Sequence, residues 1–236
     1  MFAFEKTLRR TVAFAALIAT LAAGPAAAEG LEGLTPNSAA AGIYGTDHLA
    51  GMADTAHLVY DYDLAGAIMP KPFHDEVVLD FARKEKAEER TYDVTVSMFT
   101  QTRNQSVGPI TSTSVNPLVM VFLQRDVNQM GRSTGGSSHY FRNVIRRAMA
   151  AAGHHTETPV SIDWQGKTLE ATRISFQPFI SDKNKARMES FAAKTYSFTL
   201  APGVPGGVYE VGSSTAEPGG DKVLLRETYR LRESTQ

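Results

Sequence analysis

The period at which apolar residues recur changes twice along this chain. Before and after residues 116–153, apolar residues recur at every second position, whereas within this stretch they recur at every third or fourth. Side chains alternate between the two faces of a β-strand, while an α-helix brings every third or fourth residue to one face. The chain is therefore predicted to be β-rich, with a pair of helices inserted into its middle.

The first of these helices is predicted to begin at Asn116-Pro117, because asparagine is a favourable N-cap and proline fits the first helical position. The apolar run 118–123 is also compatible with a buried strand, but the cap and the continuation of the pattern to residue 130 favour a helix. Gly135-Gly136 supplies the conformation in which helices commonly end. The predicted apolar face consists of Val119, Phe122, Leu123, Val127 and Met130.

The second helix is predicted to begin after a serine cap, either Ser137 or Ser138, and to end at Gly153. Its residues again recur at helical spacing, so they form one apolar face that needs a partner to cover it. This face consists of Phe141, Val144, Ile145, Ala148, Met149 and Ala152.

Strands are predicted on both sides of the helical pair, where apolar and polar residues alternate. Polar and charged runs separate them, as in an antiparallel meander with one wet face. Residues 182–193 are compatible with a short helix or a long loop. The predicted strands are 57–64, 76–83, 92–98, 160–164, 168–176, 195–200 and 223–231, with shorter ones near 110–115 and 208–211.

The chain begins with a pattern typical of a secretory signal peptide. Basic residues lie among the first ten, an apolar run covers residues 11–24, and Ala26-Ala27-Ala28 supplies small residues for cleavage near Ala28. We therefore predict a signal peptide over 1–28 and export to the periplasm. Arg9-Arg10 leaves the twin-arginine route open beside the general secretory one. No later apolar segment approaches the twenty residues of a membrane span, so none is expected in the mature chain.

Charge and cysteine content restrict the function classes. Lysine and arginine number 24 against 25 acidic residues, and there is no cysteine. A nucleic-acid binder usually shows a basic excess, so nucleic acid is not expected as a partner. Without cysteine the leader cannot carry the lipid anchor of a lipoprotein, and no disulfide can form.

Metal, cofactor and catalytic patterns are weak. His154-His155 with Glu157, and the separate Asp47-His48, lack the ligand spacing of a zinc site, so no metal or cofactor is expected. No Gly-x-Ser-x-Gly elbow occurs, and no catalytic residues are predicted. An unrecognised hydrolase stays as the third interpretation, since it would need only a polar cleft with a paired nucleophile and base.

These patterns predict a mainly β fold with an α insertion, an α+β arrangement. The two apolar helix faces need a cover, and the apolar face of the sheet is available. The simplest solution is a curved antiparallel sheet, or open barrel, packed on a central helical pair. Residues 29–54, rich in small and polar residues, are expected to be a weakly ordered segment, followed by one β-rich domain over 55–236 with its helical insertion at 116–153.

The middle of the chain also resembles a family. Asn116-Pro117-Leu118, the run Phe122 to Asp126, Thr134-Gly135-Gly136 and the run Tyr140 to Asn143 are similar to segments of an uncharacterised group of exported bacterial proteins. Their layout resembles the lipoprotein-carrier type of open β-barrel. This resemblance implies a periplasmic protein of the cell envelope that holds an acyl chain or another apolar ligand, and it implies no catalytic residues.

Two surfaces are predicted to carry function. In the leading interpretation, a non-enzymatic periplasmic protein binds an apolar or amphiphilic envelope component such as a lipid, because open barrels place a cavity between sheet and helices. Its predicted ligand-binding residues are Phe122, Met130, Phe141, Ile145 and Met149. In the second, the protein is a scaffold that binds an envelope protein or an anion through a basic helical face. That face consists of Arg125, Arg132, Arg142, Arg146 and Arg147.

Overall fold

One antiparallel sheet contains the nine strands of the described chain, in the order β4-β3-β2-β1-β9-β8-β7-β6-β5. The computed structural model describes residues 34–236 apart from 88, 101–103, 218 and 221, so the predicted signal peptide 1–28 with its cleavage near Ala28 lies outside the described residues. The strands are β1 (Thr55–Ala65), β2 (Phe73–Arg83), β3 (Tyr92–Met98), β4 (Gln105–Ser112), β5 (Thr156–Trp164), β6 (Lys167–Phe176), β7 (Thr195–Leu200), β8 (Val208–Ala216) and β9 (Val223–Thr235).

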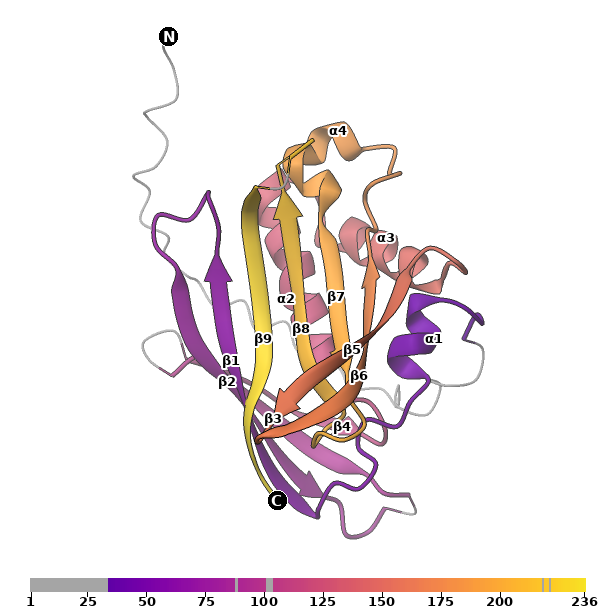
Figure 1. Ribbon diagram of the computed structural model, residues 1–236, viewed down its shortest axis with the longest axis vertical. Coiled ribbons are helices and arrows are strands. Elements are labelled where there is room, and N and C mark those ends of the chain that lie inside the picture. Colours follow the sequence, from indigo (N-terminus) through magenta and orange to yellow (C-terminus); the bar gives the residue numbers. More distant parts are fainter. Residues whose placement is uncertain (1–33, 88, 101–103, 218, 221) are drawn as a thin grey trace.

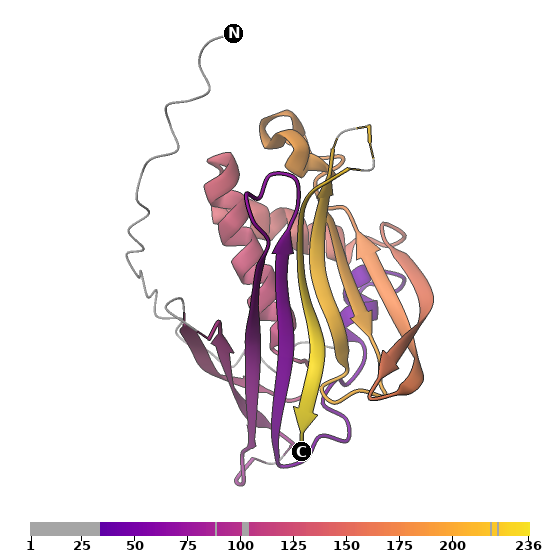
Figure 2. The ribbon, with the colours of Figure 1, turned by 60° about the vertical axis from the view of Figure 1, so that its left-hand side comes forward.

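The topology explains why the helices lie in the middle of the sequence. Strands β1 to β4 step outward to one edge, and β5 to β9 return from the opposite edge until β9 pairs with β1. Helices α2 (Leu118–Thr134) and α3 (Ser138–Ala150) therefore carry the chain from one edge to the other. Figures 1 and 2 show them along one face of the curved, unclosed sheet, which confirms the predicted fold class.

Both predicted helices form, and the strand interpretation of 118–123 is wrong. The Asn116 side chain accepts a hydrogen bond from the Leu118 amide at 3.0 Å, which satisfies one free donor at the start of α2. Gly135 ends α2 in the left-handed conformation at φ 69°. The Ser137 hydroxyl caps α3 by accepting from the Tyr140 amide at 3.1 Å.

Several elements differ in extent from the prediction. The strand near 110–115 begins earlier, at Gln105, and the strand beginning at Val208 continues to Ala216. The segment 182–193 forms α4 (Lys185–Met188) and a short 3-10 helix, η1 (Glu189–Ala193). None of the helices in the described ranges is both long and apolar enough to cross a bilayer.

The N-terminal part of the described chain corrects one expectation. Residues 29–54 were expected to be weakly ordered, but the described part of this segment, 34–54, includes α1 (Ala39–Tyr44), capped by the Ser38 side chain. Ala39, Ile43 and Leu49 are fully buried. Helix α1 packs on α3 and β6, because its small side chains permit close approach. Composition indicated disorder, whereas tertiary packing orders this segment.

Candidate ligand-binding site

The five predicted ligand-binding residues lie in the packed interior. Phe122 and Met130 on α2, with Phe141, Ile145 and Met149 on α3, are each at most 5% exposed. The ring of Phe122 contacts those of Tyr196, Phe198 and Tyr229 at centroid distances of 6.1, 5.8 and 5.7 Å. Side chains thus occupy the space between α2 and the sheet at this point, and none of the five lines the hollow described below.

Two charged residues of α2 point toward the sheet instead of outward. Arg125 is only 31% exposed, and its Nε donates to the Tyr229 hydroxyl at 3.1 Å. Its guanidinium lies 3.8 Å from the Glu227 carboxylate and 5.0 Å from the centre of the Phe99 ring. Arg125 is therefore half-buried against the sheet, while Arg132, Arg142, Arg146 and Arg147 are exposed.

Asp126 is completely buried and bonds two partners from the other half of the chain. Its carboxylate accepts hydrogen bonds from the Lys194 ammonium and from the Tyr196 hydroxyl. Burial, together with the charge of Asp126, raises the pKa of Tyr196 well above its usual value, so the phenol stays a neutral donor. Asp126 lies one helical turn from both Phe122 and Met130, so its position within the apolar face was the sequence signal for burial.

Glu227 completes a buried polar network beside this pair. Tyr62 and Tyr229, which are paired across β1 and β9, donate to Glu227 Oε1 at 2.9 and 3.0 Å. Burial and the Glu227 charge raise the pKa of both phenols. We call Arg125, Asp126, Lys194, Glu227 and the three tyrosines the α2 polar network. Its two acids and two bases compensate one another, so it is suited to anchoring α2 and not to exchanging protons with a ligand.

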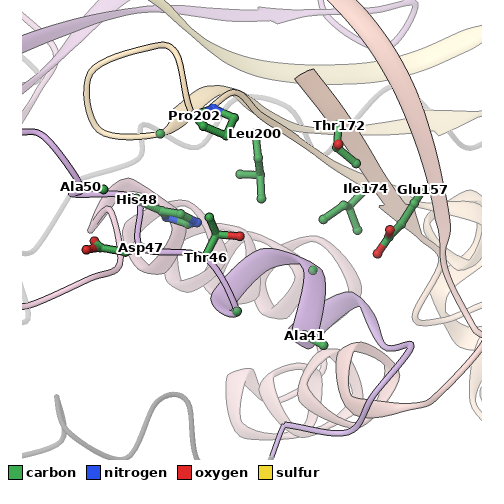
Figure 3. Close-up of a pocket in the computed structure, with 13 residues that line it drawn as sticks. Ala41, Thr46, Asp47, His48, Ala50, Glu157, Thr172, Ile174, Leu200 and Pro202 are labelled. Carbon is green, nitrogen blue, oxygen red and sulfur yellow. The ribbon is translucent and has the colours of Figure 1, made fainter. Parts of the chain in front are cut away.

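A hollow of about 310 Å³ lies between α1, the loop that follows α1, and strands β6 and β7. Figure 3 shows Thr172, Ile174 and Leu200 along one wall, with His48 toward one end and Glu157 toward the other. Sequence patterns did not indicate this hollow, because residues 29–54, which include α1, were expected to be weakly ordered. The lining residues are Ala41, Gly42, Gly45, Thr46, Asp47, His48, Ala50, Glu157, Thr172, Ile174, Leu200, Pro202 and Gly207.

His48 is the most deeply buried polar residue of this lining, at 3% exposure. Its Nδ1 accepts a hydrogen bond from the Asn116 amide at 3.2 Å, so the neutral ring carries its proton on Nε2. Within the described part of the chain, Nε2 has no hydrogen-bond partner. Burial lowers the pKa of His48, although the Ile43 carbonyl and the Asp47 charge oppose this shift. The hollow therefore borders a neutral imidazole whose Nε2 is itself buried.

Glu157 lies at the end of the hollow opposite His48. Its Oε1 lies 3.0 Å from His155 Nε2, and its side chain is 49% exposed. Helix α1 approaches this wall closely at Gly42, where an added Cβ would lie 2.6 Å from Ile174 Cδ1 and 2.9 Å from Glu157 Oε1. The described residues contain no group of three or more histidine, aspartate or glutamate side chains placed to hold a metal ion.

The fold and the site define the class of protein. It has an unclosed antiparallel sheet with helices on one face and a hollow of ligand size beside α1. No family model matches the chain, and no curated protein matches it. Among solved structures the chain is similar to a LolA superfamily protein from Nitrosomonas europaea, at 7% identity and a TM-score of 0.20. The match covers 84% of this chain and 93% of that one. A likeness at this level does not extend to ligand or function.

Proposed function

We propose that this chain is an exported, non-enzymatic protein of the cell envelope that binds a small apolar or amphiphilic molecule in the hollow beside α1. The observation that carries the proposal is the composition of the hollow, which combines an apolar wall with polar ends. Its volume of about 310 Å³ lies at the lower end of the range usual for small-molecule sites. A ligand of modest size therefore fits better than a whole phospholipid.

The lining restricts the chemistry of the ligand. Ile174, Leu200 and Pro202 offer a surface on which an apolar body gains free energy by leaving water. Glu157 places a half-exposed carboxylate at one end, which disfavours an acidic headgroup there, whereas the Asp47 carboxylate is paired with Arg90 at 3.1 Å. The proposed ligand is accordingly a neutral or cationic amphiphile whose polar group reaches the ring of His48 or the carboxylate of Glu157.

Export to the periplasm belongs to this proposal and is supported by the basic, apolar and small-residue regions of 1–28. Measuring the intact mass of the protein recovered from the periplasm tests it. Cleavage near Ala28 is the expected result. An uncleaved chain retained in the cytoplasm would remove the envelope from the proposal while leaving the hollow as a binding site.

Binding is tested with the mature protein and a neutral apolar fluorescent probe, N-phenylnaphthylamine. Ala41→Phe places a large ring in the hollow and should weaken probe binding by at least about tenfold. Ala150→Phe is the matched control, because Ala150 is exposed at the end of α3 and is not among the lining residues. Native mass spectrometry of the wild-type protein from the periplasm then identifies the retained ligand.

Two results would overturn the proposal. The first is wild-type protein that neither binds the probe nor retains a molecule from the periplasm. The second is equal probe affinity in Ala41→Phe and Ala150→Phe, provided that circular dichroism shows both variants to be folded.

A further inference from the structure

We infer that the outer surface of α3 and the adjoining α4 segment docks onto an anionic phospholipid membrane. The residues of this basic surface are Arg132, Arg142, Arg146, Arg147, Lys183 and Lys185, all exposed. The inference rests on the charge and continuity of this surface, and it is independent of the hollow beside α1.

The two segments form one continuous surface because Tyr140 joins them. Its hydroxyl donates to the Asp182 carboxylate and accepts from Asn184 Nδ2 at 3.0 Å. On the other side of α3, Arg142 donates to the Gln124 side chain of α2 at 3.0 Å. Figure 1 shows α3 and α4 toward the same end of the molecule.

Cations outnumber carboxylates on this surface. Within 131–151 and 180–189 the carboxylates are Asp182 and Glu189, and Asp182 is occupied by Tyr140 and by the Asn184 amide. Among the described residues, none of the six cations forms an ion pair with a carboxylate, whereas the chain as a whole carries a formal charge of −1. The protein thus concentrates positive potential on one side, which complements a layer of lipid phosphates.

An exposed apolar residue favours a membrane over an acidic protein as the partner. Ile180 is 46% exposed, and the Lys185 ammonium lies 3.5 Å from its carbonyl oxygen. An apolar side chain among lysines and arginines is typical of segments that lie in the headgroup region, where the apolar group inserts and the cations meet phosphates. A tight protein interface would instead need a buried aromatic or apolar centre. The aromatic residue here, Tyr140, is already bonded within the chain.

Docking would also place the hollow close to the lipid. Helix α1 packs on α3, and a β-bridge pairs Ser38, the N-cap of α1, with Ala152 just beyond α3. A protein seated on α3 therefore holds the wall formed by α1 beside the membrane surface, where an amphiphile could be exchanged.

Cosedimentation of the mature protein with vesicles tests the inference. Vesicles of phosphatidylcholine with phosphatidylglycerol should bind the protein, vesicles of phosphatidylcholine alone should not, and added salt should release it. The triple variant Arg142→Gln, Arg146→Gln, Arg147→Gln should lose at least about tenfold in vesicle affinity. The control variant Lys86→Gln, Lys167→Gln, Arg226→Gln removes the same charge from exposed positions elsewhere and should bind as the wild type does.

A second variant, Ile180→Ser, tests the apolar contribution without a change in net charge. It should weaken vesicle binding without altering the salt dependence of binding. Equal losses in both triple variants would overturn the inference, since net charge alone would then explain binding. Failure of the wild type to bind phosphatidylglycerol vesicles would also overturn it. If the three arginines of α3 captured an acidic envelope protein in that case, the surface would belong to a protein partner.

Discussion

Buried polar groups have hydrogen-bond partners in the α2 polar network, whereas one such group beside the hollow near α1 has none. In the network, Asp126 and Glu227 are each matched by a cation and by tyrosine hydroxyls. In the hollow, His48 is nearly as deeply buried, yet its Nε2 has no partner among the described residues. An unpaired buried polar atom costs free energy, so the packing beside the hollow is less fully satisfied than that of the network.

The difference separates anchoring from binding. The network joins α2 to β1, β7 and β9 through groups whose charges cancel, which fixes the helix on the sheet. The hollow is formed by a short helix and a loop that pack through small side chains. Changes in the network should therefore act on stability alone, whereas changes around the hollow should also alter affinity. Four measurements test this difference between the two regions.

Replacing Asp126 with alanine should lower the free energy of unfolding by about 3–5 kcal/mol, because it leaves the Lys194 ammonium buried without a partner. Urea unfolding followed by circular dichroism measures the loss. Asp80→Ala is the control, since Asp80 is an exposed carboxylate on β2 and should change stability by about 0.5 kcal/mol or less. A loss below about 1 kcal/mol for Asp126→Ala would show that the network does not anchor α2.

Gly42→Ala should cost about 1–3 kcal/mol, because its methyl group would lie 2.6 Å from Ile174 Cδ1 and push α1 away from β6. The same urea titration measures it, and probe binding should fall together with stability, since Gly42 lines the hollow. Gly220→Ala is the matched control, as an added Cβ there meets no atom closer than 4.0 Å. Unchanged stability in Gly42→Ala would mean that α1 is not seated on the sheet.

Most of the fold was accessible from periodicity because helices and strands leave different repeats in a sequence. The change of period around residues 116–153 predicted α2 and α3, and the caps at Asn116 and Ser137 mark their starts. The N-terminal helix was missed for a physical reason. A run of alanine and glycine has little apolar surface, so its order comes from the close packing that small side chains allow, which composition does not reveal.

The candidate site was less accessible for the same reason. Residues 41–50, 157, 172–174 and 200–207 contribute to the lining of the hollow. No local sequence pattern indicates that these segments lie together. Arg125 was assigned to the outer basic face, but Arg125 and Asp126 both turn toward the sheet and its tyrosines. Only the position of Asp126 within an apolar helical face hinted at a buried charge. The ligand-binding role of the five interior residues stays a prediction.

Because its tyrosines are buried as neutral phenols, the network should make the protein less stable at alkaline pH. Burial raises the pKa of Tyr62, Tyr196 and Tyr229 above the usual value of 10.0. Above pH 10 the unfolded chain releases these protons while the folded chain keeps them. The free energy of unfolding should therefore fall by up to about 1.4 kcal/mol per pH unit for each tyrosine.

The alkaline effect is measured by urea unfolding at several pH values. Tyr196→Phe should fall less steeply with pH than the wild type, because one titrating phenol has been removed. Tyr209→Phe is the control, since Tyr209 lies outside the network and its hydroxyl makes only a 3.5 Å contact with the Asp163 carbonyl among the described residues. Identical slopes for wild type and Tyr196→Phe would contradict the assignment of a neutral, buried phenol.

His48 gives the smallest effect and the sharpest contrast with the network, because it titrates on the acid side. Burial lowers its pKa below the usual 6.5, so below that pH the unfolded chain binds a proton that the folded ring resists. Its contribution to stability is present above pH 6.5 and falls, by less than about 1.4 kcal/mol per pH unit, as the solution is acidified. His48→Gln should remove this dependence, while His139→Gln, at an exposed position on α3, should retain it. Urea unfolding at several pH values below 6.5 measures the dependence. An unchanged acid slope in His48→Gln would contradict the assignment of a neutral, buried His48 ring.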